Sequence, residues 1–420
     1  MFWVGLIVRV LYITIARSYH FRTTEDHFQF GWEMGRIARA VAQGRGYADP
    51  FVNGTGPTAW SSPLYPLLLA AVFKVFGIYT PLSGWVILSL NSVFSALIAP
   101  AVYEIAIRSY GSAQRGMRLA LWSGWLWALY PAAMQYAVRW VWEMSLTAAL
   151  FAWILVLALR IRLNDDPKRP LLKYWILFGL LWGAIALSNP ALLLFFPVCI
   201  LWLLLGYKNK IVAIRHAILT CVIFTACLLP WVWRNWQVFH SLIVTRGNLG
   251  AELYEGNGPD STGFPWGLTI SIVDGHLDTR LYKQMGELNY VKIQGDKAKA
   301  YIRAHPRHFA EISLKRFYFF WAGVPHSTDK HMFLEFVREV NFCFFSITGI
   351  LGLALSLKKR IPASGLFAWA FVLLPLSYYL VTSGTRFRHP LEPLIDIFTV
   401  FLFQSASARK VRSQEPHNLP

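Results

Sequence analysis

The sequence has few charged residues for its length. Asp, Glu, Lys and Arg make up 15% of the 420 residues, whereas about 25% is usual in soluble domains. The shortage is uneven, because the charges gather in short islands between long apolar runs. Hydrophobic residues account for 55% of the chain, and a helix needs roughly 20 apolar residues to cross a bilayer core. The scarcity of charge therefore excludes a soluble globular domain and predicts an integral membrane protein.

Cysteine is also scarce, with four residues and no CxxC pair. All four lie within apolar runs, where cysteine usually serves as a small core residue; they are Cys199, Cys221, Cys227 and Cys343. We therefore expect no disulfide and no structural zinc site. No cleavage pattern follows the first apolar run, residues 2–16, so we expect that run to remain as a span.

Acidic residues are outnumbered by lysine and arginine, and the net charge is +18. Such an excess can indicate a nucleic-acid-binding protein. Here, however, the basic residues lie between apolar runs, as in the cytoplasmic loops of membrane proteins. We therefore expect contacts with membrane lipids and none with nucleic acid.

The apolar runs predict an all-α polytopic protein with about ten transmembrane helices. The predicted spans are 2–17, 83–107, 119–136, 142–159, 174–189, 190–206, 217–233, 340–357, 364–382 and 391–405. Alternation places every strongly basic loop on one side; these residues are Arg108, Arg115, Arg118, Arg160, Arg162, Lys168, Arg169, Lys173, Lys208, Lys210, Arg215, Lys358, Lys359, Arg360, Arg409, Lys410 and Arg412. By the positive-inside rule that side is cytoplasmic, so both ends of the chain are expected inside, in a bacterial inner membrane.

Two long segments, 18–82 and 234–338, are then left on the outer side. Both contain many aromatic residues, which argues against disordered linkers. The stretch from Leu64 to Gly77 is apolar but too short to span, so we expect a helix lying in the interface. The chain accordingly divides into a transmembrane module of residues 1–233 that includes the first outer segment, the outer segment 234–338, C-terminal helices in 339–405, and a cytoplasmic tail, 406–420.

Two acidic residues of the first outer segment are candidate catalytic groups. Apolar residues recur at spacings of three and four from Phe30 to Val41, which predicts a helix over 27–42. Asp26 and Glu33 are seven residues apart and would share one face of that helix. A carboxylate at the membrane surface is costly unless it is paired or has a task. A solvated loop carboxylate is the plain alternative, and it weighs more for Asp26 than for Glu33.

Glu143 lies at the outer end of a predicted span in an aromatic context. An ionisable residue in that position is a functional candidate by default. Arg139 precedes it by four residues on the same expected helix face, so a local ion pair that only positions the helix is the alternative.

The short run before the last span holds Arg386, Arg388 and His389 within four residues. Pro390 is expected to begin the next helix. Because a guanidinium fork matches phosphate oxygens, this run predicts a phosphate site, to which Arg139 is added as a further cation. The alternative is arginines that snorkel toward lipid headgroups.

Short motifs are spread along most of the chain. In order they are GRIARAVAQGRGYADPF, TAWSSPLYPLLLAAVFKVFG, Ser188-Asn189-Pro190, Leu253-Tyr254-Glu255-Gly256-Asn257, His305-Pro306-Arg307-His308-Phe309, and Arg386-Phe387-Arg388-His389-Pro390-Leu391-Glu392-Pro393. Their order and topological side resemble the GT-C superfamily of glycosyltransferases. More narrowly they are similar to the family 39-like group, which includes protein O-mannosyltransferases and the aminoarabinose transferases of lipid A.

The resemblance implies a polyprenyl-phosphate sugar donor and a lipid, glycan or protein acceptor on the outer side. One carboxylate would be the general base, the anomeric carbon would be attacked with inversion, and the lipid phosphate would leave. The implied roles are Glu33 or Asp26 as base, Glu143 orienting the acceptor or the base, Arg388, Arg386, His389 and Arg139 holding the phosphate, and Trp60, Tyr65 and Asn257 contacting substrate.

The sequence departs from the family pattern at the expected loop acid. That position, eight residues before Ala38, is held here by Phe30. The nearest acids, Asp26 and Glu33, lie about one turn to either side, and Glu33 is ranked first. The second motif also reads Ser-Pro-Leu-Tyr, with one proline fewer than in the family.

Cofactors and rival functions remain open at this point. No nucleotide-binding loop is expected for a lipid donor; a divalent metal at the acids is an open alternative, and Asp165-Asp166 on the inner side is a poor metal site. A lipid or sugar transporter or flippase is the main rival, although no internal repeat is present. A noncatalytic subunit of an envelope glycan assembly system and an O-antigen-ligase-like enzyme are the others.

Overall fold

The computed structural model describes residues 1–21, 30–51, 54–163, 171–207, 209–264, 277–324 and 332–414. These residues form α-helices and short 3-10 helices joined by loops. Pairing of extended backbone among them is limited to an isolated antiparallel bridge between Ala48 and Pro57. The all-α architecture predicted from the apolar runs is therefore confirmed.

The helices follow one another along the chain with few long loops. They are α1 (Phe2–Ile15), α2 (Trp32–Ala42), α3 (Leu64–Phe76), α4 (Pro81–Tyr110), α5 (Gln114–Leu129), α6 (Pro131–Val138), α7 (Met144–Arg162), α8 (Leu172–Ala186), η2 (Pro190–Phe195), α9 (Phe196–Gly206), α10 (Lys210–Phe239), α11 (Leu249–Asn257), α12 (Leu277–Met285), α13 (Glu287–Ala304), α14 (Pro306–Ala322), α15 (Met332–Lys358), α16 (Ser364–Leu380), η3 (Thr385–Leu391) and α17 (Glu392–Gln414).

Helices occupy all ten predicted spans. Within the described residues, four are long and apolar enough to cross a membrane, namely α4, α7, α10 and residues 336–358 of α15. Other predicted spans coincide with shorter apolar helices, such as α1, α8 and α16. The apolar helices thus fit a multi-pass membrane protein, and the count of ten spans stays a prediction.

Two predicted helix boundaries are wrong. The span expected over 119–136 is two helices, because Pro131 has no backbone N–H to continue α5 and begins α6 instead. The helix expected over 27–42 begins only at Trp32, after Gly31 in a left-handed conformation. Asp26 lies outside the described residues, and so do Asp165 and Asp166.

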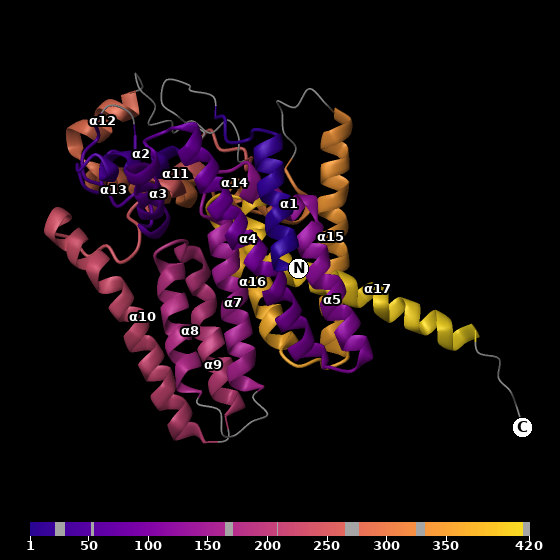
Figure 1. Cartoon of the computed structure of the whole chain (residues 1–420). Helices are drawn as coiled ribbons and strands as arrows, with labels where there is room; N and C mark the ends of the chain where they lie inside the picture. Colours follow the sequence, from indigo (N-terminus) through magenta and orange to yellow (C-terminus); the bar gives the residue numbers. More distant parts are fainter. Residues whose placement is uncertain are drawn as a thin grey trace, which may run out of the picture.

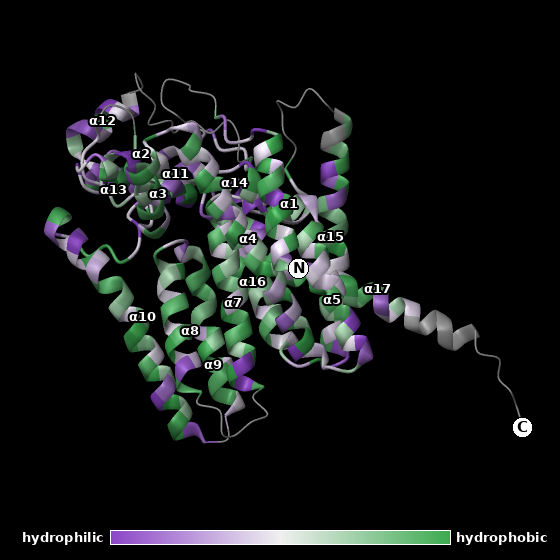
Figure 2. Ribbon diagram, viewed as in Figure 1, coloured by the Kyte–Doolittle hydropathy of each residue, from purple (hydrophilic) through white to green (hydrophobic). Residues whose placement is uncertain are grey.

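The long helices form a bundle, and α2, α3 and α11–α14 gather at one end of it, here called the capped end (Figure 1). The bundle helices are predominantly apolar, and hydrophilic residues concentrate at the capped end and at the tips of the helices (Figure 2). Large aromatic side chains fill the bundle interior, where Trp127, Trp175 and Trp182 are fully buried. The bundle therefore supplies a rigid apolar body beneath a polar end.

Candidate active site

A cavity of about 350 Å³ lies at the capped end of the bundle. Its walls come from the start of α7, the breaks before η2 and α17, the end of α16, the loop after α10, and helices α2 and α11. Five charged side chains among the described residues line it: Glu33, Glu143, Glu252, Arg246 and Arg386. Segments far apart in the sequence thus place three carboxylates and two guanidiniums around one cavity.

Glu33 reaches the cavity because of a close backbone contact at Gly31. Gly31 has a φ of 93°, and a Cβ there would lie 2.6 Å from the carbonyl oxygen of Val141. Only glycine tolerates both the conformation and the approach. Helix α2 starts directly afterwards, so Glu33 stands in its first turn, where free backbone N–H groups favour a carboxylate.

Glu143 lies in a break between helices and not on a continuous helix. Helix α6 ends at Val138, and α7 begins at Met144 with Glu143 as its N-cap. The alternative considered above, an ion pair of Glu143 with Arg139, does not form. Arg139 is exposed outside the cavity, and its Nη2 donates to the hydroxyl of Tyr12 at 2.7 Å.

The break that carries Glu143 is held from below by α3 and α4. The hydroxyl of Tyr65 donates to Asn91 Oδ1 at 3.1 Å, and Asn91 Nδ2 donates to the carbonyl oxygen of Trp140 at 3.0 Å. Tyr65 is 1% exposed and lies outside the cavity. Tyr65 thus supports the cavity wall, and its expected substrate contact stays a prediction.

Arg386 is fixed between aromatic rings. Its guanidinium lies 4.1 Å from the ring centre of Trp142 and 4.8 Å from that of Phe387. Trp142 stacks in turn on Trp140 at 5.4 Å, and Phe387 on Tyr378 at 4.4 Å. Such cation–π contacts orient the guanidinium plane without using its N–H donors, so those donors are available to a ligand in the cavity.

Arg388 does not line the cavity, so the structure does not bring this expected phosphate ligand to the candidate site. It is 1% exposed, and its Nε donates to Glu392 Oε1 at 2.6 Å. Its Nη1 donates to the hydroxyl of Ser346 and, more weakly, to the carbonyl oxygen of Trp321 at 3.4 Å. The guanidinium is already paired and withdrawn from solvent.

His389 also lies outside the cavity, fully buried between aromatic rings. Its ring centre is 4.7 Å from that of Tyr136 and 5.6 Å from that of Trp127. It packs in the bundle interior, so the expected phosphate contact of His389 is not supported either.

Replacing Arg388 with alanine should lower the stability of the fold by about 3–5 kcal/mol, because Glu392 is left buried without its partner. Thermal unfolding in detergent would measure the loss. Replacing both residues, Arg388→Met with Glu392→Leu, should recover most of it, since an apolar pair is close to neutral. If Arg388 held the phosphate, the double variant would recover stability but would still lack transfer activity.

Two other residues expected to contact substrate, Trp60 and Asn257, lie outside the cavity. Trp60 is 8% exposed and packs against Phe51 and Tyr282, with ring centres 4.9 and 6.2 Å away. Asn257 is 1% exposed and accepts from Arg316 Nη1 at 3.0 Å while donating to the carbonyl oxygen of Leu380 at 3.0 Å. Both residues join elements of the capped end.

Helix α11 adds acidic groups that the sequence reasoning missed. A Cβ on Gly256 would meet the carbonyl of Val381, so α11 packs directly against the end of α16 and brings Glu252 into the cavity wall. Arg246, in the loop before α11, was missed as well. The sequence signal that could have indicated these acids is the AELYEGN run, where Glu252 and Glu255 are three residues apart and would share one face of a helix.

The carboxylates influence one another. Burial and then the neighbouring charge of Glu252 raise the pKa of Glu33, while Arg386 and Arg36 lower it. Burial, with Glu252 and Glu33, raises the pKa of Glu255 to about 8. A raised pKa suits a carboxylate that must take up a proton near neutral pH.

Over the described ranges, no three His, Cys, Asp or Glu side chains gather closely enough to hold an ion. The three cavity carboxylates stand on separate elements, on α2, before α7 and on α11.

Comparison with known proteins is informative at the level of structure. No protein-family profile and no curated sequence matches the chain. Its fold matches that of the oligosaccharyltransferase AglB from Archaeoglobus fulgidus in complex with an inhibitory peptide and a dolichol-phosphate, with a TM-score of 0.54 and 14% identity over 100% of this chain. The chain has a GT-C fold.

A second structure of the same oligosaccharyltransferase, in complex with Zn and sulfate, matches with a TM-score of 0.53 and 14% identity over 97% of this chain. The chain spans about half the length of that enzyme, 50% to 52%. ArnT from Cupriavidus metallidurans bound to undecaprenyl phosphate gives a TM-score of 0.37 at 12% identity, covering 98% of this chain and 80% of ArnT. The fold assignment rests on the oligosaccharyltransferase, so the narrower family 39-like resemblance stays a prediction.

Proposed function

We propose that this protein is a membrane glycosyltransferase that moves a sugar from a polyprenyl-phosphate donor to an acceptor at the capped end. The observation that carries the proposal is a single cavity at the polar end of an apolar GT-C bundle, with carboxylates and guanidiniums together on its wall. Carboxylates suit deprotonation of an acceptor, and guanidiniums suit a phosphate that gains charge as it leaves.

Glu33 is the proposed general base. It removes a proton from the acceptor's hydroxyl or amine, whose lone pair then forms the bond to the anomeric carbon. The bond from that carbon to the phosphate oxygen breaks, and its electron pair leaves with the polyprenyl phosphate. Attack opposite the leaving group inverts the configuration.

Arg386 and Arg246 are the proposed phosphate-binding pair. Both line the cavity, and in the described part of the chain neither guanidinium is taken up by a hydrogen bond or an ion pair. Glu143 stands on the same wall beside Trp142 and Thr147, where it orients the acceptor. Of the arginines expected from the sequence, Arg386 keeps its phosphate role in this proposal, and Arg246 takes the place of Arg388.

The proposed site lies on the extracytoplasmic side. This placement follows from the basic loops, which collect at the opposite ends of the spans from the cavity. The proposal also includes about ten membrane spans. The lipid donor would enter from the bilayer, and the acceptor would be a lipid, a glycan or a peptide. The dolichol-phosphate bound to the oligosaccharyltransferase AglB is in line with a lipid donor.

The experiment is transfer by the purified protein in lipid nanodiscs. A panel of polyprenyl-phosphate sugars is offered with a crude envelope lipid and peptide acceptor fraction, and release of polyprenyl phosphate is followed by mass spectrometry. Release that depends on acceptor supports the function. If the protein turned over none of the donors and did not bind polyprenyl phosphate, the cavity would be ruled out as a donor site.

The rate of transfer should depend on pH through Glu33. The base works only when deprotonated, so the rate should rise with pH through the raised pKa of Glu33, above the ordinary range of glutamate. The charge of Glu252 raises that pKa, so Glu252→Gln should move the acid limb of kcat to lower pH.

The control for this shift is Glu311→Gln, an exposed glutamate of α14 outside the cavity, which should leave the limb in place. A limb that stays fixed, or moves to higher pH, in Glu252→Gln would exclude Glu33 as the titrating base.

A further inference from the structure

The loop between α10 and α11 carries the cavity residue Arg246, and its backbone is fixed at the next residue. The N–H of Gly247 donates to the carbonyl oxygen of Ala59 at 2.8 Å. Ala59 belongs to the first outer segment, and it is fully buried. The position of Ala59 therefore sets where the backbone beneath Arg246 lies.

Ala59 is held in place by a carboxylate that does not touch the cavity. Glu287 opens α13 and is 4% exposed. Its Oε1 accepts from the N–H of Ala59 at 2.7 Å, and its Oε2 accepts from the hydroxyls of Thr58 and of Tyr282, the latter at 2.7 Å. Two of these three hydrogen bonds hold residues 58 and 59, and the third ties the Glu287 carboxylate to Tyr282.

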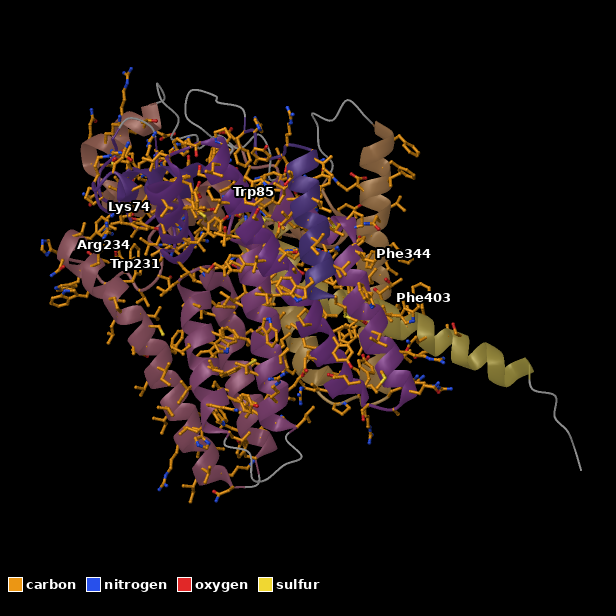
Figure 3. The ribbon with its side chains drawn as sticks, in the orientation of Figure 1. Lys74, Trp85, Trp231, Arg234, Phe344 and Phe403 are labelled. Atoms are coloured by element: carbon orange, nitrogen blue, oxygen red, sulfur yellow. The ribbon has the colours of Figure 1, made fainter. Side chains whose placement is uncertain are left out.

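The opposite side of the same segment is held by Arg234, at the upper end of α10 beside Trp231 (Figure 3). Its Nη1 donates to the carbonyl oxygen of Thr58 at 2.7 Å, and its Nη2 donates to that of Tyr47 at 2.6 Å. Trp231 Nε1 donates to the carbonyl oxygen of Thr245 at 2.5 Å, next to Arg246. The loop that carries Arg246 is thus bonded on both sides of that residue, at Thr245 by Trp231 and at Gly247 by Ala59.

We propose that Glu287, assisted by Arg234, is a positioning residue for Arg246, acting through Thr58, Ala59 and Gly247. The inference rests on the proposed phosphate role of Arg246. It gives the two cavity guanidiniums different supports: Arg386 is oriented by aromatic rings, and Arg246 by a buried polar relay from the second outer segment. A purely structural Glu287 would affect stability but would not act through Arg246.

The first test measures the loop without any ligand. Glu287→Gln keeps the side-chain volume but replaces one carboxylate oxygen with an NH₂ group. That group is itself a donor, so at least one of the hydrogen bonds now received from Thr58, Ala59 and Tyr282 is lost. Backbone hydrogen exchange of a peptide covering 243–249 should become about tenfold faster, while peptides from α7 stay unchanged. Exchange in 243–249 equal to that of the unmodified protein would overturn the proposal.

The second test is a cycle of variants with polyprenyl phosphate as the probe, in nanodiscs. Glu287→Gln should weaken its binding about tenfold in the native background, because a small misplacement of a binding group is costly. In an Arg246→Gln background the same change should have less than a twofold effect. Equal weakening in both backgrounds would show that Glu287 does not act through Arg246.

The two tests separate this inference from the proposed function. Faster exchange in 243–249 together with no binding of polyprenyl phosphate by the native protein would uphold the relay and reject the phosphate role. If Glu287→Gln fails to fold, Tyr282→Phe removes one donor and should still speed exchange in 243–249. Tyr290→Phe, in the same aromatic cluster but without a bond to Glu287 among the described residues, is the matched control and should not.

Discussion

Replacing Glu33 with glutamine should reduce the kcat of sugar transfer by about 10²- to 10⁴-fold, the usual contribution of a general base. Glutamine keeps the shape of the side chain in the first turn of α2 but cannot take up the acceptor's proton. The KM for the lipid donor should change little, because the proposed phosphate contacts belong to Arg386 and Arg246. Initial rates in nanodiscs at saturating donor would measure the loss.

The matched control is Glu311→Gln, which removes the same charge from an exposed position on α14. It should retain the native rate. Full turnover in Glu33→Gln together with loss in Glu143→Gln would assign the base to Glu143, and loss only in Asp26→Asn would assign it to the segment before α2. Full turnover in all three would reject the proposed carboxylate mechanism.

The candidate acids could be found from the sequence because each is a carboxylate at a helix end in an apolar, aromatic context. Glu33 and Glu143 both satisfy that rule, and both line the same cavity. The sequence could not show that they meet, because the meeting depends on Gly31 approaching the carbonyl of Val141. A positive φ at one glycine is a tertiary fact that helical periodicity does not report.

The arginines show the same limit in a different form. Arg386 and Arg388 are two residues apart, and the charge pattern treats them alike. In the 3-10 helix η3 they diverge, one onto the faces of Trp142 and Phe387 and the other onto Glu392. Which partner each arginine finds depends on α7 and α17, so the sequence located the cationic run but could not distinguish the surroundings of Arg386 from those of Arg388.

The helical bundle was predictable because apolar runs of span length carry strong, local information. The arrangement of the helices at the capped end was harder to predict from the sequence. Helix α11 is short, and Glu252 enters the cavity only because Gly256 lets α11 contact Val381. Arg246 lies in an irregular loop whose position depends on Ala59 from the first outer segment. Local patterns place neither residue at the site.

Replacing Arg386 with glutamine should lower kcat/KM for the lipid donor by about 10²- to 10³-fold, as expected when a fixed donor to a developing charge is removed. The leaving phosphate gains charge in the transition state, so kcat should fall as well as donor affinity. Arg386→Lys should recover only part of the loss, because an ammonium cannot stack between Trp142 and Phe387 or offer a planar fork.

The specificity of that loss depends on comparison with another arginine. Arg303→Gln removes an exposed guanidinium from α13, outside the cavity, and should leave kcat/KM unchanged. Inhibition by added polyprenyl phosphate should weaken in Arg386→Gln and not in Arg303→Gln, because product and leaving group share the site. If Arg386→Gln kept native inhibition while Arg388→Gln lost it without any loss of thermal stability, the phosphate would belong at Arg388 and the cavity assignment would fail.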